Sequence, residues 1–108
     1  PSDVEWTQLI DYLGGDEAAG GKLKETGTAH WDSPNEGATN ETGFTALPGG
    51  ARGYDGTFYT VGGSSHWWSA TEIDANDAWS WDVYSYGSGL GGYGGSKEFG
   101  YSVRCVRN

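Results

Sequence analysis

The sequence is poor in cysteine, in basic residues and in aliphatic side chains. Its one cysteine, Cys105, cannot form an internal disulfide. Six basic residues against fifteen acidic ones give a net charge of -9, which argues against nucleic acid, because that binding depends on neutralised phosphates. The same charge disfavours an anionic membrane surface, and no apolar run approaches the ~20 residues of a membrane span. We therefore expect no nucleic-acid partner and no direct membrane insertion.

Large aromatic rings take the place of the missing aliphatic side chains. Hydrophobic residues make up 35% of the chain, yet it contains six Trp, seven Tyr and twenty Gly. Each ring buries more area than an aliphatic side chain, so a few rings can form a core. The length of 108 residues allows a single domain, residues 1–108, and the aromatic content argues against disorder.

The chain begins at Pro1 without methionine, which indicates a fragment or a mature product. Cys105 then has two interpretations, between which the residues alone do not decide. It is either a small buried hydrophobic residue, as free cysteines often are, or half of a disulfide whose partner lies upstream of Pro1.

The first fifteen residues predict an amphipathic helix. Ser2 and Glu5 have the spacing of a capping box, and Gly14 and Gly15 are typical of a helix C-terminus. Between these signals, apolar residues recur at helical spacing: Trp6, Leu9, Ile10 and Leu13. From residue 16 to residue 40 the sequence patterns are weak and indicate irregular loop. Within this stretch, residues 22–24 fit either a short strand or one helical turn, and Trp31 is expected to be an isolated ring in the core.

Alternating patterns predict strands in the second half. They cover residues 44–47, 57–61, 66–71, 77–83 and 100–107, and Asp55-Gly56 predicts a hairpin turn. Alternation places Tyr101 and Cys105 on one face of the last strand and favours a core position for Trp79. A helix followed by short strands and glycine turns indicates an α+β fold with an antiparallel sheet and long irregular loops.

Residues 80–96 are the segment that we expect to carry the function. Fourteen of these seventeen residues are Gly, Ser, Tyr or Trp, which is the composition of an antibody-like binding surface. The candidate contact residues comprise aromatic and apolar anchors and polar neighbours: Ser80, Trp81, Asp82, Tyr84, Tyr86, Ser88, Leu90 and Tyr93. The alternative is a passive glycine-rich loop. In such a loop these rings would form an exposed apolar surface that favours aggregation and serves no purpose.

Signals for catalysis or metal binding are weak. There is no nucleophile elbow, phosphate loop or zinc-ligand spacing. A hydrolase would have to use Glu72, Asp74 or His66, without a visible pairing of nucleophile and base. Asp74, Asn76 and Asp77 supply oxygen ligands that could hold calcium, but they are equally typical turn formers. We therefore expect a protein that is not an enzyme and needs no cofactor.

Five stretches of the chain, in order, resemble the Fibrobacter succinogenes major paralogous domain. They are residues 1–15 (PSDVEWTQLIDYLGG), 20–25 (GGKLKE), 43–50 (GFTALPGG), 67–72 (WWSATE) and 100–107 (GYSVRCVR). The resemblance implies a branch of the C-type lectin-like fold, related to the scaffold of the formylglycine-generating enzymes, in secreted or lipid-anchored bacterial surface proteins. It also implies that a cysteine-containing segment normally precedes Pro1, which would supply a partner for Cys105.

The resemblance extends to variable proteins of diversity-generating retroelements, in which Asn codons are rewritten. In the family, the stretch after the equivalent of Ala78-Trp79 is often rich in Asn and Ser. In this sequence the stretch is rich in Tyr, Gly and Ser, a composition that either rewritten Asn codons or ordinary sequence drift could produce. The sugar-binding Glu-Pro-Asn and Gln-Pro-Asp sequences of calcium-dependent lectins are absent, and Cys105 alone does not supply the cysteine chemistry of the enzymes. We therefore expect an extracellular domain, part of a longer surface protein, that binds a protein or cell-surface ligand. The alternative is a fixed structural or adhesion-accessory module.

Overall fold

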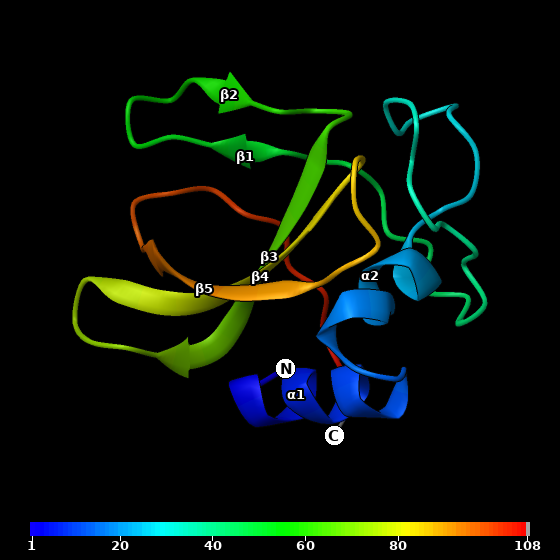
Figure 1. Ribbon diagram of the computed structural model, residues 1–108. Coiled ribbons are helices and arrows are strands. Elements are labelled where there is room, and N and C mark those ends of the chain that lie inside the picture. Colours follow the sequence, from blue (N-terminus) through cyan, green and yellow to red (C-terminus); the bar gives the residue numbers. More distant parts are fainter. Residues whose placement is uncertain (108) are drawn as a thin grey trace.

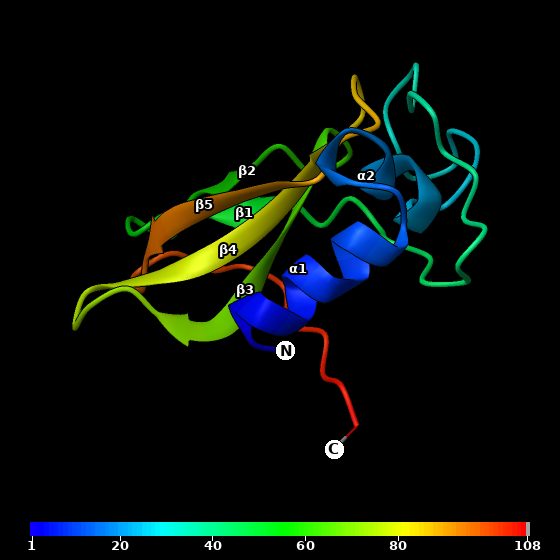
Figure 2. The same cartoon turned by 60° about the horizontal axis from the view of Figure 1, so that its bottom comes forward.

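The computed structural model describes residues 1–107, which form a small α+β domain (Figure 1). This confirms the predicted class. The elements in chain order are α1 (Asp3–Tyr12), α2 (Asp16–Leu23), β1 (Ala51–Arg52), β2 (Phe58–Tyr59), β3 (Ser64–Glu72), β4 (Asp77–Tyr84) and β5 (Gly91–Ser96). The strands pair antiparallel in two sheets, ordered β1-β2 and β3-β4-β5. The larger sheet lies between α1 and the β1-β2 hairpin in both views (Figures 1 and 2).

Helix α1 begins and ends where the sequence predicts. The Ser2 side chain accepts a hydrogen bond from the Glu5 amide at 3.3 Å, and the Ser2 amide donates to the Glu5 carboxylate at 2.8 Å. This reciprocal pair is the predicted capping box. Gly14 follows the helix with φ +99°, a conformation that favours glycine. Trp6 and Ile10 on its apolar face are buried.

The expectation of irregular loop from residue 16 is wrong, because residues 16–23 form helix α2. The sequence gives little sign of this helix, since it contains two consecutive glycines that weaken a helix. Both glycines are used for close approach. A Cβ atom on Gly20 would overlap the carbonyl oxygen of Gly89, and one on Gly21 would overlap that of Gly37. Packing of bare backbone against two loops therefore outweighs the low intrinsic helix propensity of this segment.

The two β-hairpins confirm the predicted strands at residues 66–71 and 77–83, whereas of residues 57–61 only Phe58–Tyr59 forms a strand. Arg52 pairs with Phe58 across the turn that contains Asp55-Gly56, and β3 pairs with β4 in the register Trp67 to Trp81. A strand that the sequence did not predict, β5, pairs with the other edge of β4 although Gly91 begins it and four of its residues are glycine. Its pairing is possible because the backbone alone supplies the hydrogen bonds of a ladder.

Two predicted strands are wrong. Within residues 44–47 only Ala46 forms an isolated bridge, to Lys24, and Thr45 has φ +53°, which interrupts an extended segment. Within residues 100–107 only single bridges occur, and Cys105 is exposed in irregular backbone. The interpretation of Cys105 as a buried hydrophobic residue is therefore also wrong.

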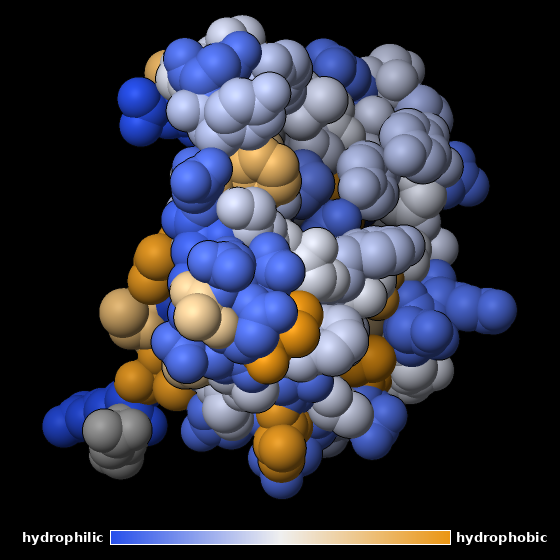
Figure 3. Space-filling view, turned by 90° about the vertical axis from the view of Figure 1, so that its left-hand side faces the viewer, coloured by the Kyte–Doolittle hydropathy of each residue, from blue (hydrophilic) through white to orange (hydrophobic). Residues whose placement is uncertain are grey.

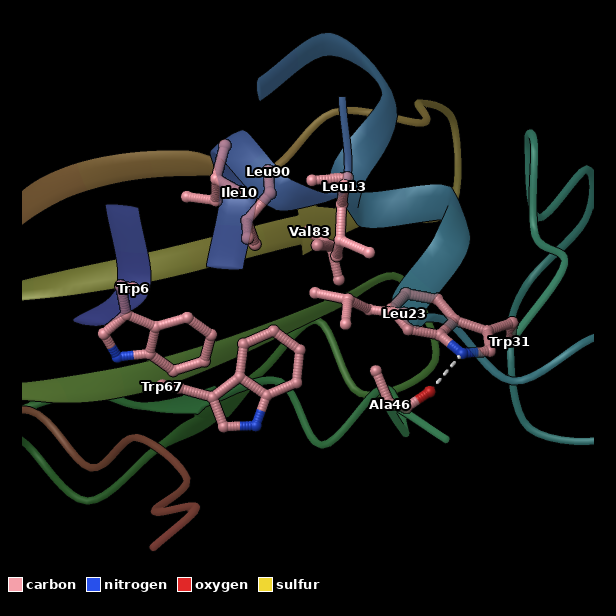
Figure 4. Close-up of a cluster of buried hydrophobic side chains, with 10 residues drawn as sticks. Trp6, Ile10, Leu13, Leu23, Trp31, Ala46, Trp67, Val83 and Leu90 are labelled. Carbon is pink, nitrogen blue, oxygen red and sulfur yellow. Dashed lines mark hydrogen bonds between the residues drawn. The ribbon is translucent and has the colours of Figure 1, made fainter. Parts of the chain in front are cut away.

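The composition predicts a core of large rings, and the structure bears this out in part, since three tryptophans share the core with seven aliphatic residues. Trp6 of α1 packs against Trp67 of β3, with ring centroids 6.1 Å apart, and Trp31 donates from its indole nitrogen to the Ala46 carbonyl at 2.9 Å (Figure 4). The remaining fully buried members are aliphatic: Ile10, Leu13, Ala19, Leu23, Val83 and Leu90. The prediction of a core position for Trp79 is wrong, since this side chain remains 37% exposed.

Strongly hydrophobic residues occupy separate small groups among hydrophilic ones on the face drawn in Figure 3. Such scattered groups are normal for a protein surface. Neither of the two helices in residues 1–107 has the length and apolar character needed to cross a bilayer.

Candidate functional site

Residues 80–96 do not form one continuous loop. They comprise the second half of β4, a connecting segment at residues 85–90, and β5. In the β3-β4 register, Trp67 lies opposite Trp81 and both face α1, whereas His66 lies opposite Asp82 on the other face of the sheet. The segment therefore presents some side chains to the core and others to a second face.

The connecting segment is held against α2 by three hydrogen bonds. The Leu90 amide donates to the Asp16 carbonyl at 2.8 Å, and the Gly21 amide donates to the Ser88 carbonyl at 2.8 Å. The Ser88 hydroxyl donates to the Glu17 carbonyl at 2.9 Å. A segment fixed in this way loses little conformational entropy when a ligand binds.

Lys24 fixes the same segment from within the protein. Its side chain is fully buried, and its ammonium donates to the carbonyls of Glu36 at 2.7 Å, Tyr84 at 3.0 Å and Gly87 at 2.9 Å. The ammonium also lies 5.3 Å from the centre of the Trp31 ring. Burial lowers the pKa of Lys24 to about 8, against a smaller opposing effect of the Glu36 carboxylate.

A surface pocket of about 300 Å³ lies between the first turn of α2 and the adjoining ends of β4 and β5. It is lined by acidic, aromatic and small residues: Asp16, Glu17, Asp82, Tyr84, Tyr86, Gly87, Gly89, Leu90, Gly91 and Tyr93. Five of the eight predicted contact residues therefore line one concave site. Ser88, a sixth, is half-buried in the connecting segment with its hydroxyl bonded to α2.

Three tyrosines give the pocket its character. Tyr86 is 71% exposed and Tyr93 is 57% exposed, whereas Tyr84 is half-buried beneath Tyr86, with the two rings stacked at 5.1 Å. The Tyr84 hydroxyl donates to Asp82 at 2.9 Å. Burial, and then the bond to Asp82, raise the pKa of Tyr84 well above its ordinary value, so the ring stays neutral.

Three predicted contact residues belong to the scaffold instead. Leu90 borders the pocket from beneath but is 1% exposed and packs in the core, so it is not an anchor for a ligand. Ser80 is buried and its hydroxyl donates to the Tyr93 carbonyl at 3.2 Å. Trp81 stacks on Trp6 at 6.3 Å and its indole donates to Asp3 at 3.0 Å. Composition could not separate them from true contact residues, because the burial of Ser80 and Trp81 depends on the elements that pack against β4, and that of Leu90 on α2.

His66 lies in a buried polar chain that has the order of a hydrolase triad. Its Nε2 is 3.0 Å from the Ser64 hydroxyl and its Nδ1 is 3.5 Å from Asp82. The Ser64 side chain, however, is 1% exposed and is bonded to the Thr60 hydroxyl at 2.6 Å. A nucleophile must reach its substrate, and the Ser64 hydroxyl is closed off from solvent.

The sequence of the whole described chain matches one known family. The model of the Fibrobacter succinogenes major domain covers residues 1–107. The chain belongs to this family. No curated protein and no solved structure gives a significant match.

The other predicted chemical residues of this Fibrobacter succinogenes major domain have local structural roles. Asp74 accepts hydrogen bonds at 2.8 Å from the amides of Asn76 and Asp77, as a turn former does. Glu72 forms a salt bridge of 2.8 Å with Lys97. Within residues 1–107, no three His, Cys, Asp or Glu side chains are grouped to hold a metal ion.

Sequence reasoning missed three residues of the site, Asp16, Glu17 and Lys24. They lie far from residues 80–96 in the chain, and only the packing of α2 brings them there. It also missed a second group of exposed rings, Tyr54, Phe58 and Tyr59, on the β1-β2 hairpin. Their exposure could not be read from the alternation of a two-residue strand.

Proposed function

We propose that this domain binds a protein or cell-surface ligand, without catalysis and without a cofactor, through the pocket residues Tyr84, Tyr86 and Tyr93. One observation carries the proposal: two exposed tyrosines border a concave site whose backbone is fixed by α2 and Lys24. Tyrosine offers a large contact area with few torsions to immobilise, and it is enriched among residues that dominate binding energies. A rigid frame lowers the entropic cost of that binding.

The finer fold and the cellular setting belong to the same proposal. A helix packed against an antiparallel sheet, with long irregular segments between, agrees with a branch of the C-type lectin-like fold. The motifs shared with the family support a secreted or lipid-anchored protein of the bacterial surface, of which this domain is one part. An exposed Cys105 is accessible to a disulfide partner outside these residues.

Diversification by a retroelement is the second part of the proposal. It is testable by sequencing the codons of residues 80–96 and the flanking locus across a population. We expect substitutions at exposed positions such as Tyr86 and Tyr93, matching adenines of a nearby template repeat. An invariant segment with no template repeat would remove diversification and leave a fixed binding surface.

Binding itself is tested with the labelled domain on a panel of intact bacterial and mammalian epithelial cells. We expect saturable binding to at least one cell type, reduced more than tenfold by Tyr86→Ala combined with Tyr93→Ala. The control Tyr12→Ala removes an exposed tyrosine of α1 that does not line this pocket, and it should leave binding unchanged. Melting temperatures within a few degrees would exclude unfolding as the cause. Binding unaffected by the double substitution would overturn the proposal.

A specific observation favours the alternative, a fixed structural or adhesion-accessory module. The exposed rings Tyr54 and Phe58 of the β1-β2 hairpin offer a separate apolar surface against which a neighbouring domain could pack. In that case Tyr54→Ala, and not the pocket substitutions, would reduce binding or domain association.

A further inference from the structure

The pocket beside α2 combines two kinds of side chain that together recognise positive charge. It is lined by three tyrosines and three acidic residues: Tyr84, Tyr86, Tyr93, Asp16, Glu17 and Asp82. Among the described residues that line it there is no Lys, Arg or His. We propose that this pocket binds a basic side chain, lysine or arginine, of a protein ligand. This inference rests on the proposed function and names the chemistry that the site would recognise.

Within the described chain, two of the three carboxylates of the pocket lack a cationic partner. In residues 1–107, the side chains of Asp16 and Glu17 take part in none of the three salt bridges. Asp82 is buried; its Oδ2 accepts from the Tyr84 hydroxyl, and its Oδ1 has no hydrogen-bond partner, with His66 Nδ1 at 3.5 Å. A buried charge is less screened than an exposed one, so the Asp82 carboxylate acts strongly on the pocket. The buried Lys24 ammonium, bonded to the Tyr84 and Gly87 carbonyls, opposes it in part, and the exposed carboxylates of Asp16 and Glu17 carry most of the attraction for a cation.

The rings supply a second, independent attraction. Cations are drawn to the face of an aromatic ring when they lie within about 6 Å of its centre. Tyr86 and Tyr93 are exposed and both line the pocket, and Tyr84 stacks on Tyr86. The Tyr93 ring lies over Gly91, where a Cβ atom would come within 2.7 Å of it, so this position of the ring depends on the glycine.

The size of the pocket favours a single side chain. Its volume of about 300 Å³ is at the lower end of the range for ligand pockets. Lysine and arginine have an apolar stem that can lie along the tyrosine rings while the charged head reaches the carboxylates. The net charge of -9 adds a long-range attraction for a basic partner. A small free ammonium compound would be attracted by the same groups. The experiment below therefore compares such a compound with a lysine or arginine side chain.

The test is a titration of the ¹⁵N-labelled domain followed by the backbone amide shifts of residues 84–93. The compounds are Nα-acetyl-lysine amide, Nα-acetyl-arginine amide, tetramethylammonium chloride and the neutral isostere Nα-acetyl-norleucine amide. We expect saturable shifts with the lysine or arginine compound at an affinity at least tenfold higher than with norleucine. Raising the salt concentration from 50 mM to 500 mM should weaken this binding, because exposed charges are screened.

Matched pairs of variants distinguish binding by the pocket carboxylates from a general attraction to the negative charge of the protein. Asp16→Asn with Glu17→Gln should reduce the affinity at least fivefold. Glu41→Gln with Glu98→Gln, exposed acids outside the pocket, removes the same charge and should leave the affinity within twofold. Tyr86→Ala should also reduce it at least fivefold, whereas Tyr12→Ala should not.

Each result supports or overturns the inference. Equal affinity for norleucine, no saturable shift with either basic compound, or an equal loss in the two charge pairs would overturn it. Tighter binding of tetramethylammonium than of both basic compounds would assign the pocket to a small free cation and overturn the choice of a side chain. The proposed function fails separately: loss of cell binding in the tyrosine variants with no cation preference would retain that function and reject only this inference.

Discussion

Replacing Lys24 with methionine tests whether a buried ammonium holds the candidate site in place. The substitution keeps an unbranched side chain of similar length but removes every donor. Three carbonyls, of Glu36, Tyr84 and Gly87, then lose their bond to the ammonium. Only the Tyr84 carbonyl has another donor in the described chain, the Gly87 amide at 3.4 Å.

The expected magnitude follows from these contacts. A buried polar group without a partner costs about 1–3 kcal/mol, so three carbonyls without any compensation would cost about 3–9 kcal/mol. Two effects reduce the loss: methionine avoids the desolvation that the ammonium requires, and water can reach the carbonyls of the exposed Glu36 and the half-buried Gly87. We expect Lys24→Met to lower the free energy of unfolding by about 2–5 kcal/mol.

The assay is urea unfolding at pH 7, followed by fluorescence of the six tryptophans. The matched control is Lys22→Met in the same helix, since the Lys22 ammonium bonds one carbonyl, that of Leu13, at 2.8 Å and is only half-buried. Its substitution should cost below about 1 kcal/mol. Equal losses in the two variants would refute the role assigned to Lys24, whereas a Lys24→Met chain that fails to fold would agree with it.

Three further outcomes are expected. Burial lowers the pKa of Lys24 in the folded state, so between about pH 8 and 9.5 the unfolded state binds more protons than the folded state. The wild type should therefore gain stability relative to Lys24→Met as the pH rises through this range. A constant difference between their urea midpoints would contradict this. Ser2→Ala should cost about 1 kcal/mol through loss of the helix cap, and a loss below the error of denaturant titration would reject that cap. Gly20→Ala should destabilise the domain strongly, measured by melting temperature, because its Cβ would overlap the Gly89 carbonyl, whereas Gly87→Ala meets open space and should be tolerated.

Local patterns predicted the elements whose causes lie within a few residues. The capping box from Ser2, the glycine stop at Gly14 and the turn at Asp55-Gly56 each depend on neighbours in sequence, and the structure confirms all three. Helix α2 and strand β5 depend on long-range contacts of glycine backbone instead. Intrinsic preferences oppose both elements, so no local pattern could have predicted them.

The same distinction applies to the candidate site. Composition identified Tyr86 and Tyr93, because exposed rings in a Gly- and Ser-rich segment are unusual. It could not separate them from Leu90, since burial of that side chain depends on where α2 packs. Composition also could not identify Lys24 as part of the site. Its neighbours in sequence form no clear helix or strand pattern, and they give no sign that three carbonyls from distant segments surround its ammonium.

The most direct test of the central claim is site-specific photo-crosslinking at the pocket. A p-benzoylphenylalanine is placed at Tyr86 or Tyr93, or at the control positions Tyr12 and Tyr54, and each labelled domain is irradiated on the cells that it binds. Contact through the pocket is expected to give covalent adducts of one defined mass from positions 86 and 93 and none from the controls. Adducts from Tyr54 alone, or in equal yield from all four positions, would contradict the claim.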